Sequence, residues 1–203
     1  MTENALDAEH RQLVDMLEHV WSSIADVGSG LDEAGWKQPT ECPGWTVQDN
    51  LVHITALERF ILGDPLPSED VPEDLPHVKN EIGASNERWI ESRRSWSGAD
   101  ALEEFRVTTT ARLEQLRALD DAGFAADSWT PMGPGTVADL LGFRIFDSWV
   151  HEQDMRRAID HGATKRELLE AIQSAAVPGG GPTFSSGAQA LMRLDQEGAF
   201  KKR

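Results

Sequence analysis

The chain has one cysteine, Cys42, among its 203 residues, and it has no tyrosine. A single cysteine excludes an internal disulfide and any Cys-x-x-Cys redox pair. Free cysteines are most often small buried residues, and we expect this of Cys42, which precedes Pro43. A role for Cys42 as nucleophile or metal ligand has no support beyond its nearness to His53 in the sequence.

Basic residues are also scarce, with 19 Lys and Arg against 35 Asp and Glu and a formal charge of −16. This balance argues against binding to a phosphate backbone and against docking on anionic lipid. There is no run of 18 apolar residues that would span a membrane. The N-terminus lacks the basic and apolar regions of a signal peptide, so we expect a cytoplasmic protein with neither nucleic-acid nor membrane partners.

Alternating strand patterns are lacking as well, and helical patterns dominate. Apolar residues at three- and four-residue steps predict long helices over residues 5–27, 46–62, 98–119 and 137–159, with a shorter helix over 78–95. Residues 63–77 hold four prolines among five acidic residues, which is typical of a solvated connector. Four long helices joined by one extended connection predict an all-α fold, a four-helix bundle with an additional short helix.

The composition changes after about residue 160. Residues 161–203 carry six Lys and Arg against four Asp and Glu, and the segment 178–182 is a Pro-Gly break between predicted helices at 164–176 and 184–197. We therefore predict two parts, a helical bundle over 1–160 and a helical tail with a helix pair over 161–203.

Two helices of the predicted bundle carry residues suited to metal binding. Asp147 and His151 stand four apart, so one helix face carries a carboxylate and an imidazole, and His53 lies on another helix. Two histidines and one carboxylate suit a divalent metal with an open position. Apolar neighbours should bury Asp147, and either a metal or Arg144 could neutralise its charge.

The other polar residues near this motif have more ordinary explanations. Asp154 lies three residues after His151 and either orients the imidazole ring or pairs with Arg157 at the surface. Glu152 is expected to face solvent. A lone histidine in an amphipathic helix is usually hydrogen-bonded or exposed, and this applies to His10, His19, His77 and His161.

Both motifs resemble those of one known family. The segment 40–53, Thr-Glu-Cys-Pro-Gly-Trp-Thr-Val-Gln-Asp-Asn-Leu-Val-His, is similar to a signature of mycothiol-dependent maleylpyruvate isomerase-like proteins, which belong to the DinB-like metal-binding bundles. Asp147 to Arg157 resembles the second signature, an acid-x-x-x-His-x-x-Asp pattern. Together the resemblance covers roughly residues 5–160.

The resemblance implies a DinB-like bundle that binds zinc or a similar divalent metal through His53, Asp147 and His151. In the isomerase family the acidic ligand is Glu, and Asp is one methylene shorter. The resemblance also implies a thiol-dependent transferase or isomerase that uses mycothiol or another small thiol, because a metal-bound thiol readily becomes a thiolate that attacks an electrophilic substrate. The alternative is a non-catalytic metal- or ligand-binding module, since fold alone does not settle function.

The tail has a separate resemblance. Residues 162–191 are similar to the C-terminal helix pair of carboxymuconolactone decarboxylase-like proteins. The first half of that fold and its Cys-x-x-Cys pair are missing. The match therefore implies packing or an oligomer contact, such as a homodimer, more than decarboxylase or peroxidase activity, which stays a third hypothesis.

Overall fold

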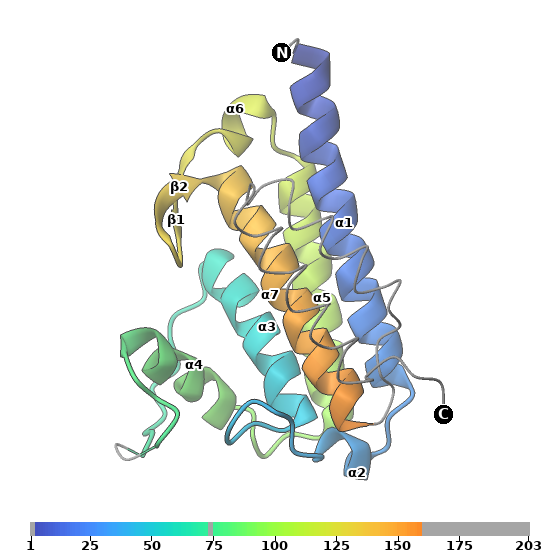
Figure 1. Ribbon diagram of the computed structural model, residues 1–203, viewed down its shortest axis with the longest axis vertical. Coiled ribbons are helices and arrows are strands. Elements are labelled where there is room, and N and C mark those ends of the chain that lie inside the picture. Colours follow the sequence, from blue (N-terminus) through green and yellow to red (C-terminus); the bar gives the residue numbers. More distant parts are fainter. Residues whose placement is uncertain (1–2, 73–74, 160–203) are drawn as a thin grey trace, which may run out of the picture. The chain divides into compact units, whose positions relative to one another are not determined.

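The computed structural model describes residues 3–72 and 75–159, which are mostly helical (Figure 1). The predicted all-α class is confirmed. None of the helices in these residues combines the length and apolar character needed to cross a bilayer. In chain order the elements are α1 (Glu3–Ser29), α2 (Glu33–Trp36), α3 (Val47–Ile61), α4 (Glu81–Glu91), α5 (Gly98–Arg117), α6 (Asp121–Phe124), β1 (Asp127–Thr130), β2 (Gly133–Thr136) and α7 (Val137–Ala158).

Capping residues fix where the two motif-bearing helices begin. The Thr46 side chain accepts a hydrogen bond from the Asp49 backbone, and the Asp49 carboxylate accepts from the Thr46 backbone, which makes a capping box ahead of α3. Thr136 and Asp139 exchange the same pair of bonds ahead of α7, at 2.8 and 3.1 Å. The predicted helix starts are confirmed at both positions.

The described residues form two compact units, and α1, α5 and α7 each contribute to both. One unit comprises residues 3–20 and 116–149, and the other comprises 21–72, 75–115 and 150–159. The second unit contains parts of all four long helices. Its apolar core includes Trp21, Ile24, Trp36, Val47, Leu51, Ile54, Trp89, Ile90, Leu102, Phe105, Leu113 and Met155.

Polar contacts also join the helices of the second unit. Arg112 on α5 donates from Nε to Glu58 on α3 at 3.2 Å, and both side chains are almost fully buried. Glu152 on α7 is only 4% exposed and accepts hydrogen bonds from Ser23 on α1 and from Arg156. The expectation that Glu152 faces solvent is therefore wrong, because this side of α7 lies against α1.

The first unit contains a hairpin that the sequence did not predict. β1 and β2 pair antiparallel, with Asp127 opposite Thr136 and Thr130 opposite Gly133. Residues 131 and 132 connect the two strands, and Gly133, the first residue of β2, has a φ of +121°. The strands have four residues each, and β2 reads Gly-Pro-Gly-Thr, so they carry no alternating pattern to detect.

Short helices and helix ends account for the other differences. α4 begins at Glu81 rather than near residue 78, because the Asn80 side chain caps it by accepting from Gly83 N at 2.9 Å. The one-turn helices α2 and α6 were not predicted, and each begins after an aspartate cap, Asp32 and Asp120. The predicted tail, 161–203, with its helix pair and second resemblance, lies outside the described residues.

Candidate metal centre

A tight turn at residues 42–45 leads into α3 and sets the position of Trp45. The Trp45 amide donates to the Cys42 carbonyl at 3.0 Å, and Gly44 has a φ of +84°. Pro43 at the second position and a positive φ at the third are the features of a type II turn. The Trp45 ring centre consequently lies 5.0 Å from that of His53 and 6.0 Å from that of His151.

A buried carboxylate holds this Trp45 side chain in place. Glu87 on α4 is 1% exposed and accepts from Trp45 Nε1 at 2.6 Å. The same oxygen lies 2.8 Å from His77 Nε2, and Arg94 approaches the other oxygen at 3.5 Å. Because three groups converge on Glu87, Trp45 forms a fixed wall beside the two histidines.

Replacing Gly44 by alanine tests whether the turn at residues 42–45 requires a residue without a side chain at this position. A Cβ at Gly44 would lie 2.8 Å from His77 Cε1, and the positive φ disfavours any side chain. We expect a loss of about 1–3 kcal/mol in the free energy of unfolding, measured by denaturant titration. Gly30→Ala is the matched control, since its Cβ would meet nothing nearer than 3.6 Å; equal stability of the two variants would contradict this account.

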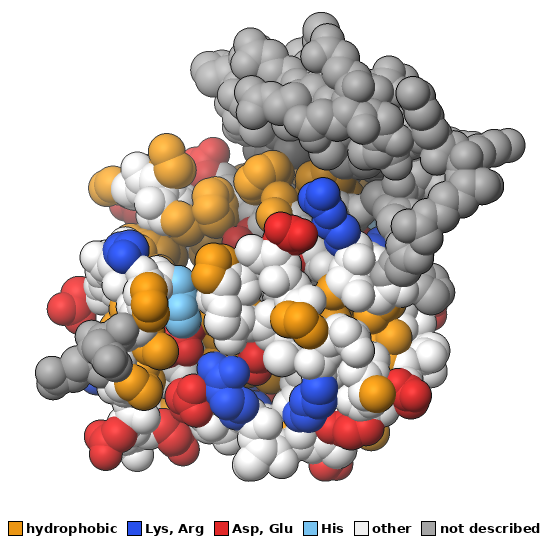
Figure 2. Space-filling model, turned by 60° about the horizontal axis from the view of Figure 1, so that its bottom comes forward, with side chains coloured by type: hydrophobic (Ala, Val, Ile, Leu, Met, Phe, Trp, Pro, Cys, Tyr) orange, Lys and Arg blue, Asp and Glu red, His pale blue; other side chains and the backbone are white. Residues whose placement is uncertain are grey.

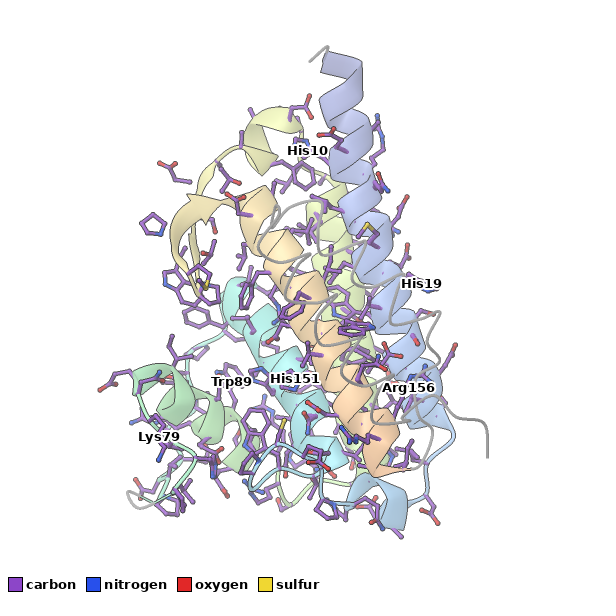
Figure 3. All side chains as sticks on the ribbon, viewed as in Figure 1. His10, His19, Lys79, Trp89, His151 and Arg156 are labelled. Atoms are coloured by element: carbon purple, nitrogen blue, oxygen red, sulfur yellow. The ribbon has the colours of Figure 1, made fainter. Side chains whose placement is uncertain are left out.

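The two histidines of the sequence motifs lie side by side. The ring centres of His53 on α3 and His151 on α7 are 4.8 Å apart, with an angle of 78° between the planes. His53 is 9% exposed, and the His151 side chain is 13% exposed. Figure 3 shows His151 on the side of α7 that faces α3. Rings this close can share one ion, because zinc–nitrogen bonds are about 2.0–2.1 Å long.

Asp147 lies one turn before His151 on α7 and offers a carboxylate oxygen within 4.8 Å of a His151 nitrogen. The Asp147 carboxylate also pairs with Arg144, whose Nη1 lies 2.5 Å from Asp147 Oδ2 and whose side chain is 1% exposed. The burial of Asp147 therefore does not by itself require a cation. Two imidazoles and a carboxylate nevertheless fit the donor set of a divalent metal such as zinc, which makes this a candidate His/Asp metal site.

Comparison with known proteins identifies the family. Residues 17–156 match the model of the mycothiol maleylpyruvate isomerase N-terminal domain. The chain belongs to this family. Both sequence motifs, with His53 and His151, fall inside the matched region, so the resemblance seen in the sequence is confirmed.

Individual relatives of this isomerase-family chain are distant. The chain is 26% identical to an uncharacterised protein of Mycobacterium tuberculosis, which is found in strains CDC 1551 and H37Rv. The match extends over 125 residues, or 61% of this chain. The chain spans about half the length of these curated relatives, 47%. Similar solved structures include the mycothiol-dependent maleylpyruvate isomerase and the sibling lethal factor precursor DfsB.

The solved structures share the fold with this family member. The isomerase structure has a TM-score of 0.56 at 16% identity, covering 81% of this chain and 67% of its own. DfsB has a TM-score of 0.59 at 16% identity, covering 76% of this chain and 98% of its own. The predicted DinB-like helical fold is therefore confirmed.

A buried asparagine sets the hydrogen position on His151 of this family member. Asn50 is fully buried, and its amide nitrogen donates to Thr40 Oγ1 at 2.9 Å and to the Thr46 carbonyl at 3.0 Å. Asn50 Oδ1 therefore faces His151 Nδ1, at 2.8 Å. Since this oxygen only accepts, Nδ1 carries the hydrogen and the neutral ring has its lone pair on Nε2. Asn50 stands three residues before His53 on α3 and was not among the predicted site residues.

Removing Asn50 should weaken metal binding without removing a ligand. We expect Asn50→Ala to lower zinc affinity about 10- to 100-fold, because the His151 ring loses the acceptor that orients it. Asn50→Asp keeps an acceptor oxygen and is expected to bind more tightly than Asn50→Ala. The titration is made in Cys42→Ser protein, so that no sulfur contributes, and unchanged affinity in Asn50→Ala would rule out the orienting role.

Two further side chains lie on the Nδ1 side of His151. Asp154 Oδ2 is 3.4 Å from His151 Nδ1 and 3.2 Å from Cys42 Sγ, while Arg157 is exposed. Cys42 is half-buried rather than buried, and its sulfur is 3.9 Å from the same nitrogen. Cys42 thus lies beside the candidate site, a position that the sequence did not predict. The only signal in the sequence was its place in the Pro-Gly turn before the His53 helix.

Charged side chains of both signs are interspersed on the face shown in Figure 2. Acidic groups predominate in the whole sequence, with a formal charge of −16. Among the described residues on this face, basic groups stand singly between acidic and hydrophobic ones, and they do not form a continuous basic stripe of the kind that tracks a nucleic-acid backbone.

Proposed function

We propose that this protein is a metal-dependent enzyme that activates a low-molecular-weight thiol, as a transferase or an isomerase. The observation that carries the proposal is the pair of largely buried imidazoles, His53 and His151, with ring centres 4.8 Å apart in a member of the isomerase family. A histidine pair of this kind with a nearby carboxylate is typical of sites that hold a catalytic divalent ion.

His53, Asp147 and His151 hold the metal in this proposal, with zinc as the expected ion. A divalent cation bound there would lower the pKa of a thiol that reaches it and so supply a thiolate near neutral pH. His151 contributes Nε2, because its Nδ1 hydrogen is directed to Asn50. Asp147 contributes the oxygen that does not pair with Arg144.

The surrounding residues bind and orient the reactants. The Trp45 ring, held by Glu87, lines the histidine pair and limits water around it. The thiol is mycothiol or another small thiol, and it gives up its proton to water. Its sulfur then bonds to an electrophilic carbon of the substrate, and the electron pair of the bond broken there leaves with a double-bond neighbour or with a leaving group. Maleylpyruvate is the first substrate to try, because the matched family and one structurally similar protein carry its name.

Metal analysis and turnover together test the proposal. In Cys42→Ser protein we expect about one equivalent of zinc per chain, lost in His53→Ala and retained in His19→Ala, whose histidine is exposed on α1. We also expect mycothiol-dependent isomerisation of maleylpyruvate, or adduct formation with another electrophile, that disappears in His53→Ala.

Two outcomes would overturn the enzyme proposal. If the His53→Ala variant kept its full zinc content, His53 would not be a metal ligand, and the proposed metal centre would be wrong. Zinc and thiol binding without product from a panel of electrophiles would instead support a non-catalytic binding module.

A further inference from the structure

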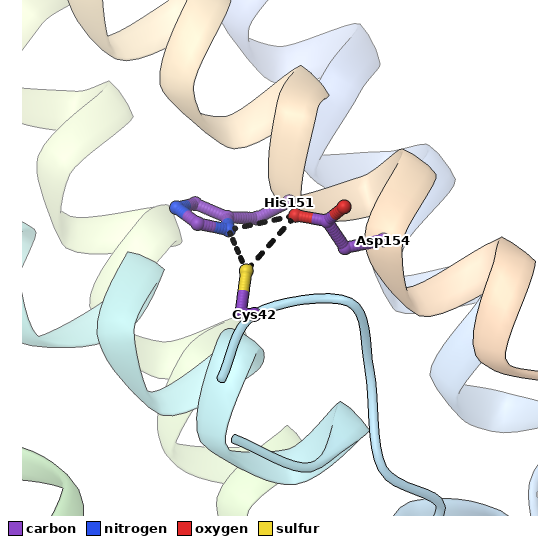
Figure 4. A group of neighbouring side chains, drawn as sticks. All are labelled: Cys42, His151 and Asp154. Carbon is purple, nitrogen blue, oxygen red and sulfur yellow. Dashed lines mark hydrogen bonds and ion pairs between the residues drawn. The ribbon is translucent and has the colours of Figure 1, made fainter. Parts of the chain in front are cut away.

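Three potential metal ligands of different chemistry meet beside the histidine pair. Cys42 from the turn before α3 and two residues of α7, His151 and Asp154, point toward one another (Figure 4). Their separations are 3.9 Å from Cys42 Sγ to His151 Nδ1, 3.2 Å from Sγ to Asp154 Oδ2, and 3.4 Å from that oxygen to Nδ1. All three residues lie in the second unit and are half-buried.

These separations match those within a tetrahedral metal site. With Zn–S near 2.3 Å and Zn–N or Zn–O near 2.0–2.2 Å, tetrahedral ligands lie about 3.3–3.6 Å from one another. The three observed distances differ from this range by about 0.3 Å or less. A hydrogen-bonded thiol needs only one of these contacts to be short, whereas a metal site needs all three at once.

We propose that Cys42, His151 and Asp154 form a second cation site, selective for thiophilic divalent ions such as Zn²⁺, Co²⁺ or Cd²⁺. The thiolate sulfur sets this preference, since soft ligands favour such ions over Mg²⁺ or Ca²⁺. On binding, the Cys42 thiol releases its proton to water. The Nδ1 hydrogen of His151 moves through solvent to Nε2, so that Nδ1 becomes the ligand.

The two sites use opposite nitrogens of one imidazole, so a single neutral ring serves one ion at a time. An ion on Nδ1 breaks the hydrogen bond to Asn50 Oδ1 and places the ring hydrogen on Nε2. Occupation of the cysteine site therefore excludes His151 from the centre with His53. This exclusion rests on the proposed function, whereas the cysteine site itself does not.

Cobalt titration of the full chain carrying His53→Ala tests the new site by itself. We expect this protein to bind one equivalent of Co²⁺ with an intense thiolate-to-cobalt charge-transfer band in the near ultraviolet. Adding Cys42→Ser should abolish the band, and adding Asp154→Ala should weaken the affinity at least about 10-fold. Cobalt bound without the band, or no cobalt bound, would overturn the site.

A second measurement does not depend on the His53 variant. Saturating Cd²⁺ should slow alkylation of Cys42 at least about 10-fold in otherwise unaltered protein, and much less in Asp154→Ala, because the ion is then held by fewer ligands. Equal alkylation rates with and without Cd²⁺ would overturn the proposal. Neither experiment measures turnover, so failure here leaves the thiol-activating proposal standing, and failure of that proposal leaves the cysteine site standing.

Discussion

Replacing His151 by alanine is expected to lower the affinity for zinc at least about 100-fold, equivalent to about 2.7 kcal/mol. The reason is that His151 lies within ligand distance of both candidate groups, the one with His53 and the one with Cys42. No other side chain of the described residues is common to these two groups. Isothermal titration with zinc, or competition with a chromophoric chelator, measures the change.

The matched control for this variant is His19→Ala. His19 is exposed on α1, so its removal should leave zinc affinity unchanged. Mycothiol-dependent turnover should fall with zinc affinity in His151→Ala and stay constant in His19→Ala. If His151→Ala bound zinc as tightly as the control, neither candidate site could be where the ion resides.

Removing Glu58 is expected to cost about 3–5 kcal/mol in the free energy of unfolding. Glu58 is fully buried and pairs with Arg112, which is 5% exposed, so Glu58→Ala would leave a buried guanidinium without this carboxylate. Glu58 also lies on the helix that carries His53 and Asn50. Denaturant unfolding, followed by the fluorescence of the seven tryptophans, measures the loss.

A surface ion pair provides the comparison for Glu58→Ala. Glu18 pairs with Arg117, and both side chains are nearly half exposed. Glu18→Ala should therefore cost less than about 1 kcal/mol, because exposed pairs contribute little. Similar losses in the free energy of unfolding in the two variants would mean that the buried Glu58–Arg112 pair stabilises the fold no more than an exposed pair does.

Structural features that depend on short stretches of sequence, such as helix positions and helix caps, could be predicted. The helix predicted over residues 98–119 is α5, and one stripe along it is buried, namely Leu102, Phe105, Thr109, Leu113 and Leu116. Helices α3 and α7 begin close to the predicted residues 46 and 137, because the capping bonds of Thr46 and Thr136 need only residues within one turn. His53 and His151 could be assigned to one site because the two motifs that contain them together resemble one family.

Contacts between distant segments could not be read from periodicity. Asn50 and His151 are 101 residues apart, Cys42 and Asp154 are 112 apart, and Ser23 and Glu152 are 129 apart. Helical spacing reports only which residues share a face of one helix, not what packs against that face. For this reason the burial of Glu152 against α1 and the contact of Asn50 with His151 could not be predicted. Arg144 was identified as one of two partners for Asp147, but only the structure shows that it pairs with this carboxylate.

Anomalous diffraction at the zinc edge, from zinc-soaked crystals of Cys42→Ser protein, tests most directly whether one ion joins the two histidines. We expect a peak about 2.0–2.1 Å from one nitrogen of each ring, His53 and His151. A zinc peak bound to only one of these rings and more than about 4 Å from the other, or no peak at either ring, would contradict it.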